Sequence, residues 1–169
     1  MCIDKRIKSL NSKSKVKVLF VCLGNICRSP TAHGVFLEKV AQASLSDLVE
    51  VDSAGTAAYH IGKAPDQRAT AAAARRGFDL TPLRARQAIT ADFAEFDYVL
   101  AMDSQNLIDL KSICPHDYEG HLGLFLEFAG RIGEEVPDPY YGGDQGFEDV
   151  LDMVEAASEG LLRDIEARL

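Results

Sequence analysis

Residues 15–30 read KVKVLFVCLGNICRSP, an apolar run followed by a short polar loop. The β-branched and aromatic first half predicts a buried β-strand. The Gly24-Asn25 pair tolerates left-handed backbone angles and predicts a tight turn after that strand. Ser29 followed by Pro30 predicts the cap and the first turn of a helix. A strand, a glycine-containing loop and a helix therefore follow one another directly at this point of the chain.

The rest of the chain repeats the alternation of strand and helix. Apolar periodicity predicts strands at 48–51, 96–102 and 122–128 and helices at 66–76, 104–113 and 147–169. A short helix would produce the same pattern as the last strand, so both remain open there. The order predicts one three-layer α/β domain, a parallel sheet flanked by helices. Ligands of such sheets bind beyond the carboxyl ends of the strands, so the first loop is the expected site.

Charge is distributed unevenly along the 169 residues. The chain has 18 Lys and Arg against 26 Asp and Glu, a formal net charge of −8. Residues 1–17 carry a net charge of +5, and residues 18–169 carry −13. A nucleic-acid partner is therefore not expected, because nonspecific binding to phosphates depends on Lys and Arg. An anionic ligand would need a local trap that acts against the field of the whole protein.

The composition, with 47% hydrophobic residues, is that of a folded domain without a membrane span. The longest apolar run, residues 18–23, is far shorter than the roughly 20 residues of a transmembrane helix. Residues 1–15 are predicted to be a flexible basic N-terminal extension, and residues 16–169 the folded domain. A targeting peptide or a membrane-surface anchor is the less favoured interpretation of the extension.

The chain has four cysteines, Cys2, Cys22, Cys27 and Cys114. Their spacing does not match a zinc site, and no signal peptide implies an oxidising compartment. We therefore expect reduced thiols in a cytoplasmic protein and no bound metal. His33, His116 and His121 also lack paired ligand spacing and are expected to be surface or helix residues.

Cys22 and Arg28 form the pattern C-x5-R, which joins the end of the predicted strand to the start of the predicted helix. Backbone N–H groups in such a loop, with the helix dipole behind them, form an anion-binding nest. Arg28 at its edge can hold two phosphate oxygens. The same positive environment favours a thiolate nucleophile at Cys22, to which Ser29 can donate a hydrogen bond. A buried structural cysteine beside a surface arginine is the alternative.

A thiolate that attacks a phosphate ester needs a proton donor for the leaving oxygen. The candidate is Asp138 in the segment VPDPYY, residues 136–141, where two prolines stiffen the backbone around the carboxylate. Pro-Asp-Pro is also ordinary turn composition. The local sequence therefore supports a turn residue and a general acid equally.

Four motifs together resemble the low-molecular-weight protein tyrosine phosphatases. They are VCLGNICRSP at 21–30, DSAGT at 52–56, AMDS at 101–104 and DPYY at 138–141. They occur in the order of that family and span residues 16–169. The resemblance implies a four-stranded parallel sheet and a phosphatase that needs no metal or other cofactor. It also implies tyrosine-phosphorylated proteins, and with them a cognate tyrosine kinase, as partners.

The resemblance implies a role for each residue of the site. Cys22 attacks phosphorus to form a phosphocysteine, while Asp138 protonates the phenolic oxygen and later activates water. Arg28 and the loop amides stabilise the charge of the phosphoryl group. The phosphate-binding loop comprises Leu23, Gly24, Asn25, Ile26, Cys27 and Ser29.

Three further residues receive supporting roles by the same resemblance. Asn25 holds the shape of the loop with Ser53 as its hydrogen-bond partner. Cys27 is the resolving cysteine that traps oxidised Cys22 as a reversible disulfide, with a small buried hydrophobe as the alternative. Leu83 stands where many members have a histidine, so the hydrogen bond of that histidine to the loop is expected to be absent or replaced.

The rim of the site is expected to select the substrate. Tyr59, Tyr140 and Tyr141 would wall a deep cleft that admits a phenyl ring and leaves phosphoserine out of reach of Cys22. His60 is the variable neighbour of Tyr59. For Tyr59, the alternative is an ordinary exposed loop residue without a role in substrate binding. By resemblance, Tyr140 and Tyr141 are also candidates for phosphorylation.

Three competing functions remain open. A protein arginine phosphatase would share the fold, although such enzymes tend to have Thr where this chain has Ile26 and a less aromatic acid loop. A thiol-dependent arsenate reductase would need further cysteines to relay a disulfide, and Cys114 has no partner close in sequence. A non-catalytic phosphoprotein binder would not need the complete set of reactive residues. We expect a monomer, with weak dimerisation as the alternative.

Overall fold

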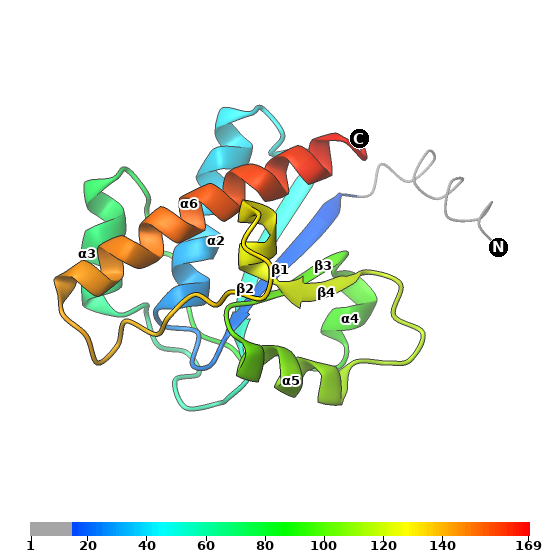
Figure 1. Cartoon of the computed structure of the whole chain (residues 1–169), viewed down its shortest axis with the longest axis horizontal. Coiled ribbons are helices and arrows are strands. Elements are labelled where there is room, and N and C mark those ends of the chain that lie inside the picture. Colours follow the sequence, from blue (N-terminus) through cyan, green and yellow to red (C-terminus); the bar gives the residue numbers. More distant parts are fainter. Residues whose placement is uncertain (1–14) are drawn as a thin grey trace.

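The structure is a computed structural model that describes residues 15–169, so the expected basic extension, except for Lys15, lies outside the described residues. In chain order the elements are β1 (Val16–Cys22), α2 (Arg28–Gln42), β2 (Val49–Gly55), α3 (Gln67–Arg75), α4 (Asp92–Glu95), β3 (Tyr98–Ala101), α5 (Ser104–Ile113), β4 (His121–Leu124), the 3-10 helix η1 (Phe125–Ala129) and α6 (Asp144–Glu166) (Figure 1). Among the helices of the described residues, none is long and apolar enough to cross a membrane.

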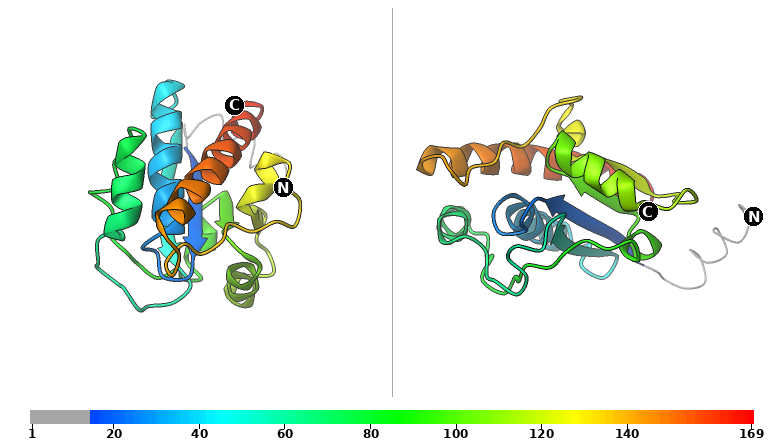
Figure 2. Two further views of the ribbon diagram at one scale, coloured as in Figure 1. Left: turned by 60° about the vertical axis from the view of Figure 1, so that its left-hand side comes forward. Right: turned by 90° about the horizontal axis from the view of Figure 1, so that it is seen from below.

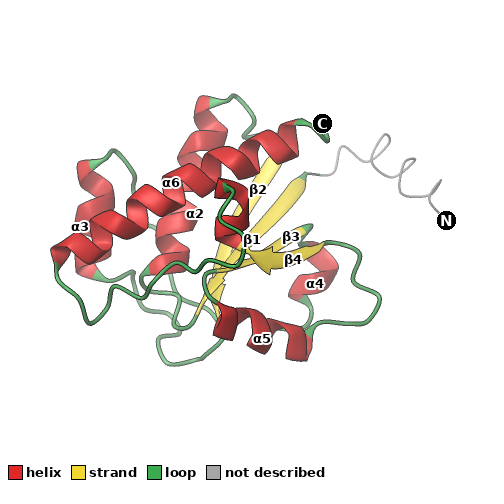
Figure 3. Cartoon of the chain, viewed as in Figure 1, coloured by secondary structure: helices red, strands yellow, loops and turns green. Residues whose placement is uncertain are grey.

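A four-stranded parallel sheet with the strand order β2-β1-β3-β4 forms the middle layer (Figure 3). The strand β1 lies inside the sheet and pairs with β2 from Val16–Val49 to Cys22–Gly55. It pairs on its other side with β3, and β3 pairs in turn with β4. Because both long edges of β1 are paired, its carboxyl end at Cys22 lies between the ends of two neighbouring strands. The predicted α/β fold with a four-stranded parallel sheet is confirmed.

Alternate side chains of β1 enter two separate cores, one on each face of the sheet. Val18 and Phe20 pack in the core formed with α2, α3 and α6, whereas Leu19 and Val21 pack in the core formed with α4 and α5. All four side chains are completely buried. In the left view of Figure 2, α3, α2 and α6 lie together and α5 lies apart from them. The apolar run of β1 is therefore continuous because helices cover both of its faces.

Some element boundaries differ from the predicted ones. The second strand continues to Gly55, through the polar Asp52 and Ser53, because its pairing with the central strand extends that far. The ambiguous segment at 122–128 contains both predicted structures, since the end of β4 is followed directly by η1. The short helix α4 has one turn and no extended periodicity, and the sequence did not reveal it.

Candidate active site

The loop after β1 curls tightly at the carboxyl end of the sheet. Asn25 has a φ of 56°, in the left-handed region, as the sequence predicts. The main chain beyond β2 supports the loop from outside, because Thr56 N donates to Cys22 O at 2.9 Å and Ala57 N donates to Leu23 O at 3.0 Å. A Cβ atom at Gly55 would lie 2.7 Å from Leu23 O, so this close approach requires glycine.

The Cys22 sulfur lies inside this curl, and the residue as a whole is 3% exposed. Its Sγ accepts a hydrogen bond from Asn25 N at 3.3 Å and lies 3.0 Å from Ser29 Oγ. Ser29 Oγ also lies 3.2 Å from Ala54 O, to which it can donate. Asn25 N therefore donates to the sulfur from the loop, and Ser29 Oγ, whose single proton can go to the sulfur or to Ala54 O, approaches it from the first turn of α2.

The expected helix cap at Ser29 is wrong. Helix α2 begins at Arg28, its cap position is Cys27, and no side chain caps it there. Ser29 lies inside the first turn with its hydroxyl facing Cys22. The hydroxyl is completely buried and bonds to the site, so it does not cap the helix. Pro30 lies in the first turn, as expected.

The expected hydrogen bond between Asn25 and Ser53 is replaced by other contacts. Asn25 Nδ2 donates to Ser29 Oγ at 2.8 Å, and Asn25 Oδ1 accepts from Arg86 N at 3.0 Å. Ser53 Oγ lies 3.0 Å from His33 Nδ1 instead. The reason is that Ser53 pairs with Phe20, whose side chain points toward α2, and His33 stands on that helix. Ser53 therefore joins β2 to α2 and does not contact the loop amide directly.

His33 belongs to a helix, as expected, but it is buried in contact with the sheet. Burial lowers the pKa of His33, and the neighbouring Asp52 opposes this shift only in part. Leu83, which stands where a histidine was considered, packs against the apolar core of α2 and α6. The main-chain N–H of Arg86 supplies the hydrogen bond that the loop amide accepts from outside.

Arg28 is buried at the entrance to α2 and is held by groups from two distant segments. Its Nη1 donates to Asp103 Oδ2 at 2.6 Å and to Val136 O at 3.2 Å. Its Nη2 lies 3.8 Å from Asp138 Oδ2. The pKa of the guanidinium is raised, because burial, which opposes its charge, is outweighed by the neighbouring sulfur and carboxylates. The guanidinium is therefore charged and oriented by three groups.

Asp103 is a site residue that sequence reasoning did not assign, although it lies in the AMDS motif. It follows β3 directly, and its Oδ1 accepts from Asn106 N at 2.7 Å, so it caps α5. The available signal was an acidic residue just beyond the carboxyl end of a strand that neighbours β1. Its place beside Arg28 depends on the strand order of the sheet.

The structure places Asp138 at the mouth of the site, with 42% of its side chain exposed. Its Oδ1 accepts from Tyr140 N at 3.0 Å, which is a turn contact. Its Oδ2 faces Arg28. The turn expected for the Pro-Asp-Pro segment is therefore present, and the second carboxylate oxygen points at the site.

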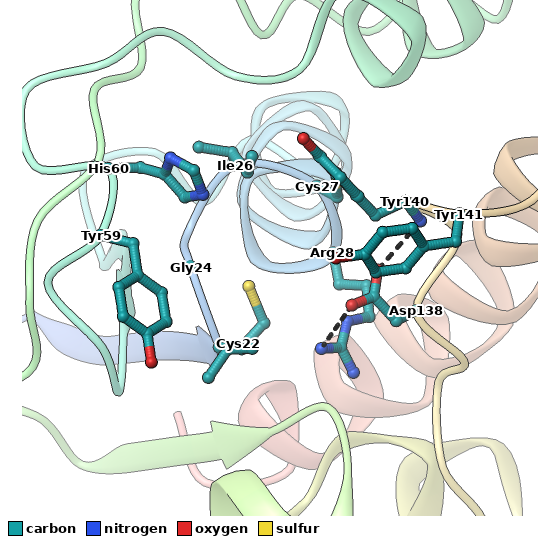
Figure 4. Close-up of a pocket in the computed structure, with 11 residues that line it drawn as sticks. Cys22, Gly24, Ile26, Cys27, Arg28, Tyr59, His60, Asp138, Tyr140 and Tyr141 are labelled. Atoms are coloured by element: carbon teal, nitrogen blue, oxygen red, sulfur yellow. Dashed lines mark hydrogen bonds and ion pairs between the residues drawn. The ribbon is translucent and has the colours of Figure 1, made fainter.

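These groups line a cavity of about 320 Å³ (Figure 4). Figure 4 shows Tyr59 and His60 on one side of the cavity, with Asp138 and the two tyrosines of the acid loop on the other. The rings of Tyr140 and Tyr141 meet edge to face with their centroids 4.9 Å apart. The lining consists of Cys22, Leu23, Gly24, Ile26, Cys27, Arg28, Tyr59, His60, Asp138, Tyr140 and Tyr141. Asn25, Ser29 and Ser53 are not in the lining; Asn25 and Ser29 are joined to each other by a hydrogen bond, and Ser53 faces His33.

Cys27 lines the same cavity and is 6% exposed. Burial, with a contribution from Asp66, raises the pKa of Cys27 to about 12, so its sulfur is a thiol at neutral pH. Cys22, Cys27 and Cys114 are free cysteines among the described residues. Cys114 packs against the core on the other face of the sheet, away from the cavity.

Comparisons of this chain with a family model, with related sequences and with solved structures agree on its family. A family model described as low molecular weight phosphotyrosine protein phosphatase matches residues 17–169. A low molecular weight protein-tyrosine-phosphatase of Streptomyces coelicolor is 44% identical over 150 residues, which cover 86% of this chain and 91% of that protein. A solved protein tyrosine phosphatase of Entamoeba histolytica is 40% identical with a TM-score of 0.86, covering 92% of this chain and 100% of that one. A Drosophila arginine phosphatase is 32% identical with a TM-score of 0.83, covering 89% and 98% of the two chains.

Proposed function

The chain belongs to the low molecular weight phosphotyrosine protein phosphatase family, and from this premise we propose how its own residues hydrolyse protein phosphotyrosine. One observation carries the proposal. The Cys22 sulfur, the Asp138 carboxylate and the buried Arg28 guanidinium beside that carboxylate line the same cavity. A nucleophile, an anion-binding group and an acid therefore surround a space that accommodates a phosphorylated ring.

The first step transfers the phosphoryl group to Cys22. The thiolate attacks phosphorus, an S–P bond forms, and the bond from phosphorus to the phenolic oxygen breaks. Asp138 donates its proton to that oxygen, so the tyrosine leaves as a neutral phenol. Arg28 and the N–H groups of the loop hold the phosphoryl oxygens during the transfer, where charge accumulates in the transition state.

The second step hydrolyses the phosphocysteine. The ionised Asp138 removes a proton from water, and the oxygen of this water attacks phosphorus as the S–P bond breaks. Cys22 leaves as a thiolate that accepts a hydrogen bond from Ser29 Oγ, 3.0 Å away in the free enzyme. Inorganic phosphate then dissociates, and both residues are again in their starting states.

The walls of the cavity favour an aromatic phosphate ester. Tyr59 and Tyr141 are 73% and 91% exposed, so their rings form the rim above the sulfur. Ile26 adds an apolar surface deeper in the cavity. A phosphotyrosine ring bridges the distance from this rim to Cys22, whereas phosphoserine is too short. We also assign tyrosine-phosphorylated proteins as substrates, and the exposed Tyr141 and its neighbour Tyr140 as targets of a cognate kinase.

Further parts of the proposal concern the state of the protein in the cell. We propose a cytoplasmic monomer, and the free thiols of Cys22, Cys27 and Cys114 suit a reducing compartment. Cys27 is proposed to form a disulfide with Cys22 once Cys22 has been oxidised to a sulfenic acid, releasing water and protecting the nucleophile from further oxidation.

A second candidate function is phosphoarginine hydrolysis, because the Drosophila relative is an arginine phosphatase. The apolar Ile26 and the aromatic acid loop favour phosphotyrosine. Comparing the hydrolysis of a phosphotyrosine peptide with that of a phosphoarginine peptide at neutral pH distinguishes the two. Arsenate reduction is less well supported, because Cys114 packs on the opposite face of the sheet from Cys27.

The decisive test is turnover of p-nitrophenyl phosphate by the wild type, Cys22→Ser and Asp138→Ala. We expect Cys22→Ser to be inactive, and Asp138→Ala to lose more activity on phenyl phosphate, whose leaving group needs protonation more. A phosphorylated Cys22 trapped by rapid acid quench should be detected by mass spectrometry in the wild type. Activity retained by Cys22→Ser would exclude the covalent mechanism.

A further inference from the structure

Arg68 on α3 contacts the acid loop from outside the cavity. Its Nη2 donates to Tyr140 O at 2.9 Å, and its guanidinium lies 5.5 Å from the centroid of the Tyr140 ring. On its other side the guanidinium lies 4.8 Å from the ring of Phe147, in the first turn of α6. The residue does not line the substrate cavity. It therefore acts on the loop and not on the substrate.

Asp66 fixes the direction of the Arg68 side chain. The guanidinium donates through Nε to Asp66 Oδ1 at 3.3 Å and through Nη2 to Asp66 Oδ2 at 3.2 Å. Asp66 also caps α3, since its Oδ1 accepts from Arg68 N and Ala69 N. The Asp66 carboxylate, already fixed by the N-terminus of α3, thus accepts hydrogen bonds from two nitrogens of the planar Arg68 guanidinium. A lysine side chain cannot make this paired contact.

The main chain of Asp66 contacts the phosphate loop itself. Asp66 N donates to Ile26 O at 2.8 Å. A continuous path of polar contacts therefore runs from the loop that holds Cys22, through Asp66 and Arg68, to the carbonyl group of Tyr140. This path spans the two loops that must meet around the phosphoryl group.

Tyr140 in turn orients the carboxyl group of Asp138. Its N–H donates to Asp138 Oδ1, while its C=O accepts from Arg68. With Oδ1 occupied by this turn contact, Oδ2 is the oxygen that faces Arg28 and the cavity. Before Asp138 in the chain, Val136 N donates to Met102 O and Val136 O accepts from Arg28; after it, the bond from Gly142 N to Pro139 O is local. Arg68 therefore provides the contact with another element that fixes the residue orienting the acid.

We propose that Arg68, held by Asp66, is a positioning residue that keeps the Asp138 carboxyl group at the distance from Cys22 that proton transfer to the leaving group requires. This inference rests on the proposed role of Asp138 as the general acid. General acid catalysis contributes roughly 10²–10⁴-fold to a rate and depends on hydrogen-bond geometry. A loop that loses its anchor keeps the acid but places it correctly for only part of the time.

The test compares Arg68→Met, which keeps the apolar stem between the two rings, with Arg75→Met. Arg75 is the matched control, because it stands on the same helix and its guanidinium donates to Glu148 on α6 instead of to the acid loop. We expect Arg68→Met to lower kcat/KM for phenyl phosphate by about tenfold and for p-nitrophenyl phosphate by about threefold or less, as a weakened proton transfer predicts. Arg75→Met should remain within about twofold of the wild type on both substrates, and Arg68→Lys should recover part of the loss.

A second readout separates positioning from a general disturbance of the site. The rate of Cys22 alkylation by iodoacetate should be unchanged in Arg68→Met, because the nucleophile is not affected. Equal losses on the two substrates, no loss at all, or slower alkylation would overturn the inference. Asp138→Ala serves as the reference: if it shows no dependence on the leaving group, the assignment of the acid fails. If it shows that dependence and Arg68→Met does not, only the role of Arg68 fails.

Discussion

Asp103 Oδ2 lies 2.6 Å from Nη1 of Arg28, in an ion pair whose arginine side chain is 4% exposed. The second oxygen of the same carboxylate accepts from Asn106 N and caps α5. One side chain therefore couples the stability of a helix to the orientation of the guanidinium that we propose binds phosphate. A buried charge that loses its partner is destabilising, so this pair matters for folding as well as for catalysis.

We predict that Asp103→Asn and Asp103→Ala separate these two functions. The asparagine keeps an oxygen for the cap but removes the charge that faces Arg28, and it should lower the free energy of unfolding by roughly 1–3 kcal/mol. The alanine also removes the cap, at a further cost of about 1 kcal/mol. Urea unfolding with and without phosphate measures both effects. Phosphate should stabilise Asp103→Asn more than the wild type, because the anion replaces the lost charge. Equal stabilities of the two variants would contradict the double role.

A second prediction concerns Arg86, which lies behind the phosphate loop. Its guanidinium meets Asp52 at 3.1 Å and both oxygens of Asp92, while its N–H donates to Asn25 Oδ1. Because a main-chain N–H can only donate, it turns Asn25 Nδ2 toward Ser29, so the Ser29 proton is available for the sulfur or for Ala54 O. We expect Arg86→Gln, which keeps this N–H but removes the ion pairs that hold it in place, to reduce kcat/KM by about three- to tenfold.

The matched control is Arg84→Gln, two residues away. The guanidinium of Arg84 donates to the carbonyl oxygens of Thr81 and Leu83 and does not contact the loop. This variant should keep the wild-type rate. Alkylation by iodoacetate at pH 6 should also be slower in Arg86→Gln, since less of the sulfur is in the thiolate form. Unchanged alkylation would limit Arg86 to a role in folding.

A third prediction uses His33, whose pKa burial lowers. Below the ordinary value near 6.5, the unfolded chain binds a proton at this residue that the folded chain does not bind. The neutral His33 side chain therefore contributes fully to the free energy of unfolding above about pH 6.5. This contribution is lost as the pH falls toward the pKa of His33 in the folded protein. Urea unfolding at pH 7 and pH 5.5 should show a smaller acid destabilisation in His33→Gln than in the wild type. His116→Gln, at an exposed position, should match the wild type.

A fourth prediction concerns the chemical difference between the two cysteines of the cavity. Since the pKa of Cys27 is about 12, iodoacetate at pH 7 should modify Cys22 and leave Cys27 as a thiol. Mass spectrometry of digested protein reads both sites. If Cys27 is the resolving cysteine, peroxide should inactivate Cys27→Ser irreversibly while dithiothreitol restores the wild type. Equal recovery of the two proteins would count against the disulfide.

The local part of the site could be predicted because its determinants are close in sequence. The strand, the left-handed Asn25 and the C-x5-R pattern lie within residues 15–30, and backbone preferences act over this range. The wrong prediction of a helix cap at Ser29 also has a local physical cause. The hydroxyl of this residue suits a helix cap, but a sulfur on the preceding strand competes for it.

Other contacts were decided by the tertiary structure. Asp103 approaches Arg28 because the sheet places the ends of β1 and β3 side by side, and Asp138 because Val136 N, two residues earlier, bonds to Met102 O just beyond β3. No local preference encodes contacts across so many residues. Likewise, Ser53 bonds to His33 because their elements pack face to face. By itself the sequence therefore determined the family, the order of the elements and the reactive loop. Packing determined the orientation of each charged group, because orientation depends on partners that only folding brings together.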